Sequence, residues 1–190
     1  MNVRAPLLSV AALCSLAACS QQTPAINHDL STAPADAFMA AIAAHCGQAY
    51  AGKVVEDTPA PTGEDPFDGK RLVMHVRGCA DPGHELRIPF HVGDDHSRTW
   101  IVTRTENGLK LKHDHRHADG SPDAITLYGG NSKPPGTAER QQFPADGDSV
   151  AMFRRADMLA STHNTWAMEI DPDQTFVYEL TRPDGRRFRV

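Results

Sequence analysis

Residues 85–117 read ELRIPFHVGDDHSRTWIVTRTENGLKLKHDHRH, and this stretch decides the expected fold. Apolar and polar residues alternate along residues 85–92, 98–106 and 109–117, which is the period-two pattern of half-buried strands. Gly93-Asp94-Asp95 and Asn107-Gly108 stand between these segments and are typical turn sequences. The stretch therefore predicts three antiparallel strands joined by two hairpins.

Strand patterns continue on both sides of this stretch, with two helices among them. Further strands are predicted at residues 49–56, 70–77, 124–128, 139–143, 165–171, 174–181 and 186–190. An apolar stripe predicts an N-terminal helix over residues 35–46, and Asp146 or Asp148 begins a short second helix over residues 147–156. The chain is thus predicted to be mainly β, an antiparallel meander of about 8–10 strands forming a barrel or half-barrel, with a β-sandwich as the alternative.

Asn107-Gly108 allows the register of its hairpin to be predicted. Asn-Gly is the strongest signal for a two-residue type I′ turn, which sets Val102 opposite His113 and Trp100 opposite His115. Residues opposite each other share a face of the sheet. The apolar face is therefore expected to carry Trp100, Val102, Leu109, Leu111, His113 and His115, and the solvent face Thr103, Thr105, Lys110, Lys112 and Asp114.

Pro183-Asp184-Gly185 predicts the register of the last hairpin. A three-residue loop ending in a left-handed glycine sets Leu180 opposite Phe188 and Tyr178 opposite Val190. This pairing keeps the apolar face continuous, whereas a two-residue loop would set Leu180 opposite an arginine. The three-residue loop is therefore predicted.

Arg104 falls on the apolar face of the first hairpin, beside Leu111. A buried arginine requires a carboxylate partner, either from the chain, such as Glu106 or Glu169, or from an anionic ligand such as a fatty acid headgroup. Four residues of this face are therefore candidates for contact with a small apolar ligand: Trp100, Val102, Arg104 and Leu111.

Histidines are dense in residues 112–117, KHDHRH. His113 and His115 lie two residues apart on a strand and so project from the same face, where they could offer zinc or copper two ligands at close range, with His117 as a third. The alternative is that they are histidines at the edge of the core that hydrogen-bond to their neighbours.

The start of the chain has the layout of a secretory signal. Arg4 is followed by an apolar stretch over residues 7–16, shorter than the about 20 apolar residues of a membrane-spanning helix. Leu16-Ala17-Ala18-Cys19 resembles the lipobox of bacterial lipoproteins. The resemblance implies cleavage before Cys19, lipidation of that cysteine and, with Ser20 following, an anchor in the outer membrane; the alternative is an ordinary signal peptide cut nearby.

This interpretation divides the chain into a signal peptide (1–18), a lipidated tether (19–34) and one β-rich domain (35–190). Residues 20–34 are polar and contain two prolines, a composition that buries no core. Loss of Arg4 with the signal leaves 18 basic and 24 acidic residues, a net charge of −6. Nucleic acid binding needs a basic face, so the expected partner is the membrane, through the lipid on Cys19, and not nucleic acid.

Cys46 and Cys79 remain as a single pair once Cys14 leaves with the signal and Cys19 carries the lipid. Such a pair in an oxidising compartment predicts a structural disulfide. Two separate buried thiols or a metal pair are the alternatives.

An opening helix followed by successive hairpins resembles the lipocalin-type (calycin) barrels over residues 47–190. Gly52 stands where their opening glycine is expected, but Ala49-Tyr50-Ala51-Gly52 lacks the tryptophan of that motif. The resemblance implies a barrel with room for an apolar small molecule. The chain is also similar to uncharacterised secreted bacterial proteins, a likeness that implies no activity.

The sequence favours binding over catalysis. His115-x-His117-x-Asp119 resembles the start of the metallo-β-lactamase motif, but Gly120 replaces its final histidine. The leading hypothesis is an envelope lipoprotein that binds an apolar or amphipathic small molecule. A metal-binding lipoprotein and a non-catalytic structural or interaction protein of the envelope are the alternatives, ahead of an enzyme.

Overall fold

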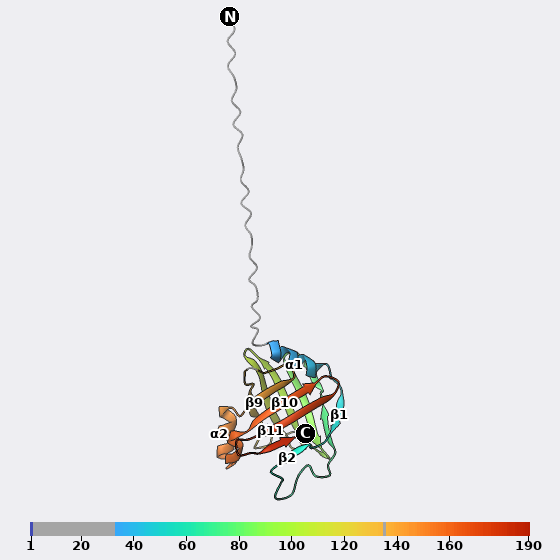
Figure 1. Cartoon of the computed structure of the whole chain (residues 1–190), viewed down its shortest axis with the longest axis vertical. Coiled ribbons are helices and arrows are strands. Elements are labelled where there is room, and N and C mark those ends of the chain that lie inside the picture. The colour runs from blue at the N-terminus through green and yellow to red at the C-terminus, as the bar shows by residue number, and fades with distance from the viewer. Residues whose placement is uncertain (2–32, 135) are drawn as a thin grey trace.

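Two antiparallel β-sheets make up most of the structure (Figure 1). The computed structural model describes residue 1, residues 33–134 and residues 136–190. It confirms the predicted fold class, mainly β with two α-helices. The described residues form no closed barrel, so the arrangement is that of a half-barrel or sandwich. The predicted lipobox and Cys19 lie outside the described residues.

Most strands that follow one another along the chain lie in the same sheet. The larger sheet has seven strands: β1 (Ala49–Gly52), β3 (Leu72–His75), β5 (Glu85–Val92), β6 (Asp95–Thr105), β7 (Gly108–His115) and β8 (Tyr128–Asn131) in spatial order, with β4 (Gly78–Asp81) paired to β5. The smaller sheet has five: β2 (Glu56–Thr58), β12 (Arg187–Arg189), β11 (Thr175–Thr181), β10 (Thr165–Asp171) and β9 (Arg140–Pro144). The chain passes between the sheets from β1 to β2, from β2 to β3 and from β8 to β9.

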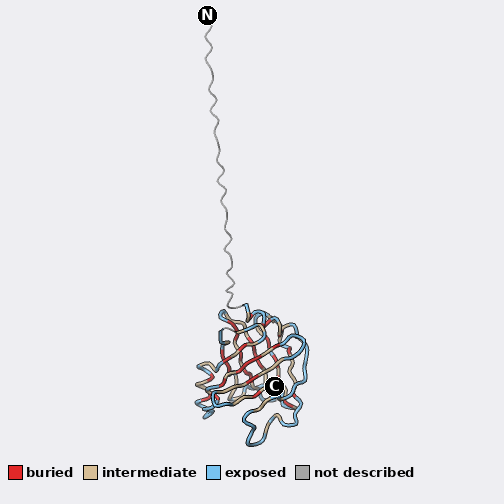
Figure 2. The backbone as a smooth tube through the Cα atoms, in the orientation of Figure 1, coloured by how far each residue is buried: buried red, intermediate tan, exposed pale blue. Residues whose placement is uncertain are grey.

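The core lies between the two sheets, where buried residues concentrate along the strands (Figure 2). Leu86, Ile88 and Val102 of the larger sheet and Phe143 and Met168 of the smaller one have no exposed surface. Burying a side chain of this size stabilises the fold by about 1.5–3 kcal/mol. The alternation that predicts the strands therefore also predicts which side chains hold the sheets together.

Helices cover the ends of this core. α1 (Ala33–Ala43) buries Phe38, Met39 and Ile42, and its first two residues belong to the segment predicted as tether. α2 (Gly147–Arg155) begins as predicted at Asp146, whose side chain accepts a hydrogen bond from the Ser149 amide, and the 3-10 helix η1 (Leu159–His163) follows it. No helix among the described residues is long and apolar enough to cross a membrane.

Strand predictions succeed where the alternation is long and fail where it is short. The bounds of β5 and β10 are as predicted. The single strand predicted at residues 49–56 is wrong, because β1 and β2 belong to different sheets. None of residues 124–127 is in a strand, and Leu127 has a φ of 57°, so the strand predicted at residues 124–128 is also wrong except for Tyr128, which begins β8. No alternation marks β4.

The β6–β7 hairpin has the predicted faces but a register shifted by two residues. Trp100 pairs with His113, two residues before the expected partner. The loop is Glu106-Asn107, and neither residue has the positive φ that a type I′ turn requires. Gly108 has a φ of 137° and begins the returning strand. Because the shift is an even number, no side chain changes face.

The β11–β12 hairpin confirms the predicted three-residue loop. Leu180 pairs with Phe188, and Tyr178 and Val190 exchange two backbone hydrogen bonds of 3.0 Å. Gly185, the last loop residue, has a φ of 92°. The apolar side of β11 is therefore continuous with that of β12.

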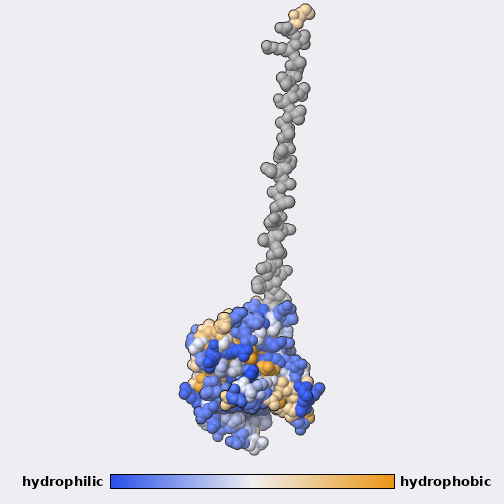
Figure 3. Space-filling view, turned by 180° about the vertical axis from the view of Figure 1, so that it is seen from behind, coloured by the Kyte–Doolittle hydropathy of each residue, from blue (hydrophilic) through white to orange (hydrophobic). Residues whose placement is uncertain are grey.

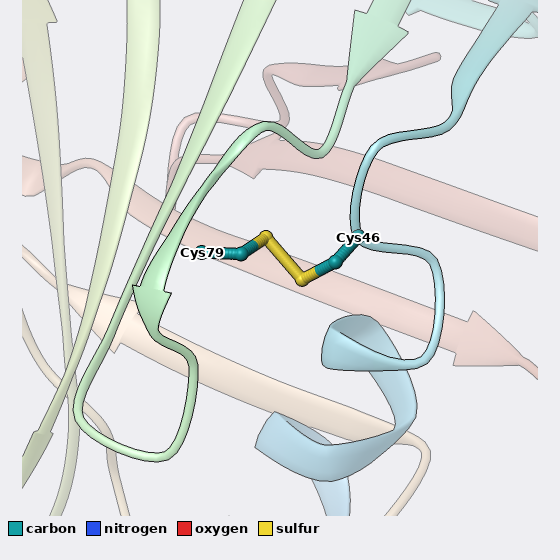
Figure 4. Close-up of a disulfide and its surroundings, with 2 residues drawn as sticks. All are labelled: Cys46 and Cys79. Atoms are coloured by element: carbon teal, nitrogen blue, oxygen red, sulfur yellow. A yellow bond between two sulfur atoms is a disulfide. The ribbon is translucent and has the colours of Figure 1, made fainter.

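Cys46 and Cys79 form the predicted disulfide (Figure 4). Their Cα atoms are 6.2 Å apart and 33 residues separate them in sequence. Closing a loop of this length stabilises a fold by about 3–4 kcal/mol in the chain-entropy model. The bond ties the segment between α1 and β1 to strand β4.

Candidate functional site

A cavity of about 470 Å³ opens beside strand β1, and we call it the β1 cavity. This volume lies within the about 300–1,000 Å³ of small-molecule pockets. Apolar side chains from both sheets and from the end of α1 form its walls: Ile42, Leu72, Met74, Val76, Phe90, Trp100, Ile170, Phe176, Tyr178 and Val190.

Polar side chains gather at the mouth of the β1 cavity. The α1–β1 segment contributes His45, whose Nδ1 lies 2.7 Å from the Tyr50 hydroxyl, and that hydroxyl donates to Gln48 Oε1 at 2.6 Å. The β10–β11 turn contributes exposed residues: Asp171, Asp173, Gln174 and Thr175. The cavity therefore combines an apolar interior with a polar entrance.

Local backbone geometry sets both halves of this mouth. Gly47, with a φ of 84°, lets the chain leave α1 and enter β1, and its amide donates to the Val76 carbonyl at 2.6 Å. In the β10–β11 turn Asp173 has a φ of 62°, a conformation that aspartate adopts more readily than most residues.

An aromatic wall separates the β1 cavity from a second one. The Trp100 ring stacks on Phe90, at 4.8 Å between centroids, and on Tyr178, at 4.6 Å. These three residues line both cavities. The second cavity has a volume of about 390 Å³, and we call it the histidine cavity because His113 and His115 line it.

His113 is buried and uses both ring nitrogens in hydrogen bonds. Nδ1 lies 3.1 Å from the Tyr128 carbonyl oxygen, and Nε2 lies 2.8 Å from the Tyr178 hydroxyl. A carbonyl only accepts, so Nδ1 carries the proton and the Tyr178 hydroxyl donates to Nε2. Burial lowers the pKa of His113 to about 3, so its ring is neutral at pH 7.

The second histidine and the two tyrosines of the histidine cavity are also neutral. His115 Nε2 lies 3.0 Å from the Tyr128 hydroxyl. Burial, together with the charge of Arg98, lowers the pKa of His115. Burial raises the pKa of Tyr128 to about 12 and that of Tyr178 well above its usual value. The histidines and tyrosines therefore form a neutral network among themselves.

The two arginines of the histidine cavity already have carboxylate partners. Arg98 pairs with Asp95 and Arg186 with Asp57. Across the described residues, no fully buried side-chain nitrogen or oxygen lacks a hydrogen-bond partner. No polar group of this cavity needs a ligand to satisfy it.

Only one of the four predicted ligand contacts lines either of these two cavities. Trp100 lines both, whereas Val102 and Leu111 have no exposed surface and line neither. Arg104 pairs with Asp36 of α1 and donates to the Gly108 carbonyl at 2.8 Å. Arg104 thus has a carboxylate partner from the chain, as predicted, but that partner is Asp36 of α1, 68 residues earlier, and not Glu106 or Glu169.

The three histidines predicted to hold zinc or copper are not brought together. His113 and His115 face the same cavity, but His117 is exposed on the turn after β7. Coordination through His113 would break one of its two hydrogen bonds. Within the part of the chain that the structure describes, no three His, Cys, Asp or Glu side chains are grouped to hold a metal ion.

Asp114 lies on its predicted face of the strand but not in solvent. It is buried, 6% exposed, although its strand face was expected to be in solvent. Arg116 Nε donates to its Oδ1 at 3.0 Å, and the Thr126 hydroxyl does so at 3.2 Å. The loop between β7 and β8 thus covers this end of the solvent face.

Sequence reasoning missed the mouth of the β1 cavity. Tyr50 and Gly52 belong to a short strand without apolar alternation, and Asp171 and Asp173 belong to an ordinary turn sequence. The only signal in the sequence was the pair of aspartates in that turn, which indicates a negative charge but not which residues lie beside it in the fold.

Comparison with known proteins adds no relative to this description: no family model, curated protein or solved structure matches the chain.

Proposed function

We propose that this chain is an exported lipoprotein, anchored through Cys19 in the outer membrane, whose β domain binds an apolar or amphipathic small molecule in the β1 cavity. The observation that carries the proposal is the cavity of about 470 Å³ with apolar walls and a polar mouth. Apolar lining with a few polar groups that fix orientation is the usual composition of a small-molecule site.

The surface supports an internal site. The face of the molecule in Figure 3 is mostly hydrophilic, with hydrophobic residues only in small groups. A large exposed apolar patch would instead favour docking of a protein or membrane surface. The apolar surface that a ligand could contact lies inside the β1 cavity, which Met74, Ile170 and Phe176 line.

The test uses N-phenylnaphthylamine, a neutral apolar dye that fluoresces when it leaves water. We expect saturable binding of one dye per purified protein. Gly52 lines the mouth, and a Cβ there meets no atom within 4 Å, so Gly52→Phe fills space without a clash. This variant is expected to lose binding.

Gly63→Phe is the matched control, because a Cβ at Gly63 also meets no atom within 4 Å and Gly63 lines neither cavity. It is expected to bind like the natural chain. Absence of saturable binding, or equal binding by Gly52→Phe, would contradict the proposed site.

The anchor has its own test. The proposal rests on the lipobox resemblance of residues 16–19 and predicts palmitate labelling of the mature protein. Cys19→Ser is expected to abolish that labelling. Undiminished labelling of the variant would contradict the lipoprotein proposal.

A further inference from the structure

The mouth of the β1 cavity carries negative charge and no compensating cation. Asp171 and Asp173 line it, and no lysine or arginine does. In the described part of the chain, neither aspartate takes part in a salt bridge. The histidine cavity differs, because it is lined by two arginines, each paired with a carboxylate, as well as by Asp123.

Hydrogen-bond roles on the other half of the mouth add an acceptor. The Tyr50 hydroxyl donates its proton to Gln48 Oε1, so toward His45 it can only accept. His45 Nδ1 therefore carries the proton, and in the neutral ring Nε2 is left as an acceptor. The mouth thus carries two carboxylates, and the His45 ring lines it beside them.

We infer that the β1 cavity selects an amphiphile with an apolar tail and a protonated amine as its head group. This inference rests on the proposed function, since the cavity is the site and the mouth only sets the charge of its ligand. An ammonium group donates to carboxylate acceptors and is attracted by their charge, whereas a carboxylate head would meet like charge at Asp171 and Asp173.

A preference for a cationic head group is the opposite of the anionic ligand that the sequence suggested as a partner of Arg104. That arginine is paired with Asp36 and lines neither cavity. A fatty acid would therefore enter the β1 cavity without a cationic partner.

Decylamine, decanol and decanoate test the inference, because they share one tail and differ in head-group charge at pH 7. Their affinities are measured on the purified protein by displacement of N-phenylnaphthylamine. An exposed ion pair changes an affinity by up to about fivefold, and the two carboxylates act with opposite sign on the two ions, so decylamine is expected to bind about tenfold or more tightly than decanoate. Raising the salt concentration should narrow the difference.

The double variant Asp171→Asn/Asp173→Asn assigns the effect. Asparagine also tolerates the positive φ of position 173, so the turn is expected to persist. Decylamine affinity should fall about two- to fivefold for each carboxylate removed, while decanol affinity stays the same. Glu106→Gln/Asp94→Asn is the control, because it removes two exposed charges from turns that line neither cavity.

Each outcome has one meaning. Preference for decylamine that disappears in the Asp171/Asp173 variant and persists in the control supports the inference. Decanoate binding as tightly as decylamine overturns it and leaves the proposed function standing, and so does a preference that survives the double substitution. If none of the three compounds displaces the dye, and the dye itself does not bind, the proposed function fails and this inference with it.

Discussion

The β1 cavity and the histidine cavity share a wall of Phe90, Trp100 and Tyr178 but use their polar groups in opposite ways. In the histidine cavity the histidines and tyrosines bond to one another: His113 to Tyr178, and His115 to Tyr128. In the β1 cavity the interior is apolar, and the polar groups stand at an exposed mouth.

This difference separates a structural cavity from a binding cavity. Buried polar groups that satisfy one another stabilise a unique arrangement of the core, and a ligand that entered would have to replace their bonds. Unpaired charge at a mouth costs little because water solvates it until a ligand arrives. The comparison therefore supports the proposal that a ligand binds in the β1 cavity, although the histidines are the more conspicuous feature of the sequence.

Replacing the shared wall should have the largest effect. Trp100→Ala removes a nearly buried ring that stacks on two others, so we expect the free energy of unfolding to fall by about 3–5 kcal/mol. Because Trp100 lines both cavities, dye binding to the β1 cavity should change as well. Urea unfolding and dye titration measure the two effects.

Trp166→Ala is the comparison variant. Trp166 is as deeply buried and lines the histidine cavity only. A similar loss of stability is expected, with dye affinity unchanged where the variant remains folded. If Trp166→Ala alters dye binding as much as Trp100→Ala does, the two cavities are not separated as we describe.

Much of the fold follows from local sequence, as the two hairpins illustrate. Pro183-Asp184-Gly185 predicted the correct pairing because its alternatives differ by one residue and would expose the apolar face. At Asn107-Gly108 the competing registers differ by two residues and keep the same faces. The hydrophobic pattern cannot distinguish between them, so the faces were predicted correctly and the pairing was not.

The candidate site depended on contacts that no local pattern contains. Arg104 was predicted to need a carboxylate, and its partner Asp36 comes from α1. Asp114 was placed on the solvent face, and a later loop buries it. The mouth of the β1 cavity joins β1 to a turn more than 100 residues later. Alternation shows which side chains are inside but not which distant segments meet.

Removing one hydroxyl from the histidine cavity should have an intermediate effect. Tyr178→Phe leaves His113 Nε2 as a buried acceptor without a donor, which costs about 1–3 kcal/mol of unfolding free energy. Tyr50→Phe removes an exposed hydroxyl from the mouth of the β1 cavity and should change stability by less than about 0.5 kcal/mol. Equal losses in urea unfolding would contradict the distinction between the two cavities.

The last expected effect is a change in how stability depends on pH. His113 has a pKa of about 3 in the folded protein, against 6.5 for an unperturbed histidine, so between these values the unfolded chain binds a proton that the folded chain does not. Stability should therefore fall as the pH drops below 6.5, by up to about 1.4 kcal/mol per pH unit from this residue. His115, whose pKa is also lowered, adds a contribution of the same sign.

His113→Gln isolates that contribution. The variant should be less stable at pH 7, because two buried hydrogen bonds change, but its unfolding free energy should fall less steeply between pH 6.5 and 5 than that of the natural chain. His117→Gln alters an exposed ring outside both cavities and should reproduce the natural slope. Urea unfolding at several pH values measures all three proteins. Identical slopes for His113→Gln and the natural chain would mean that His113 takes up its proton without unfolding, and the neutral hydrogen-bonded network would then be the wrong description of the histidine cavity.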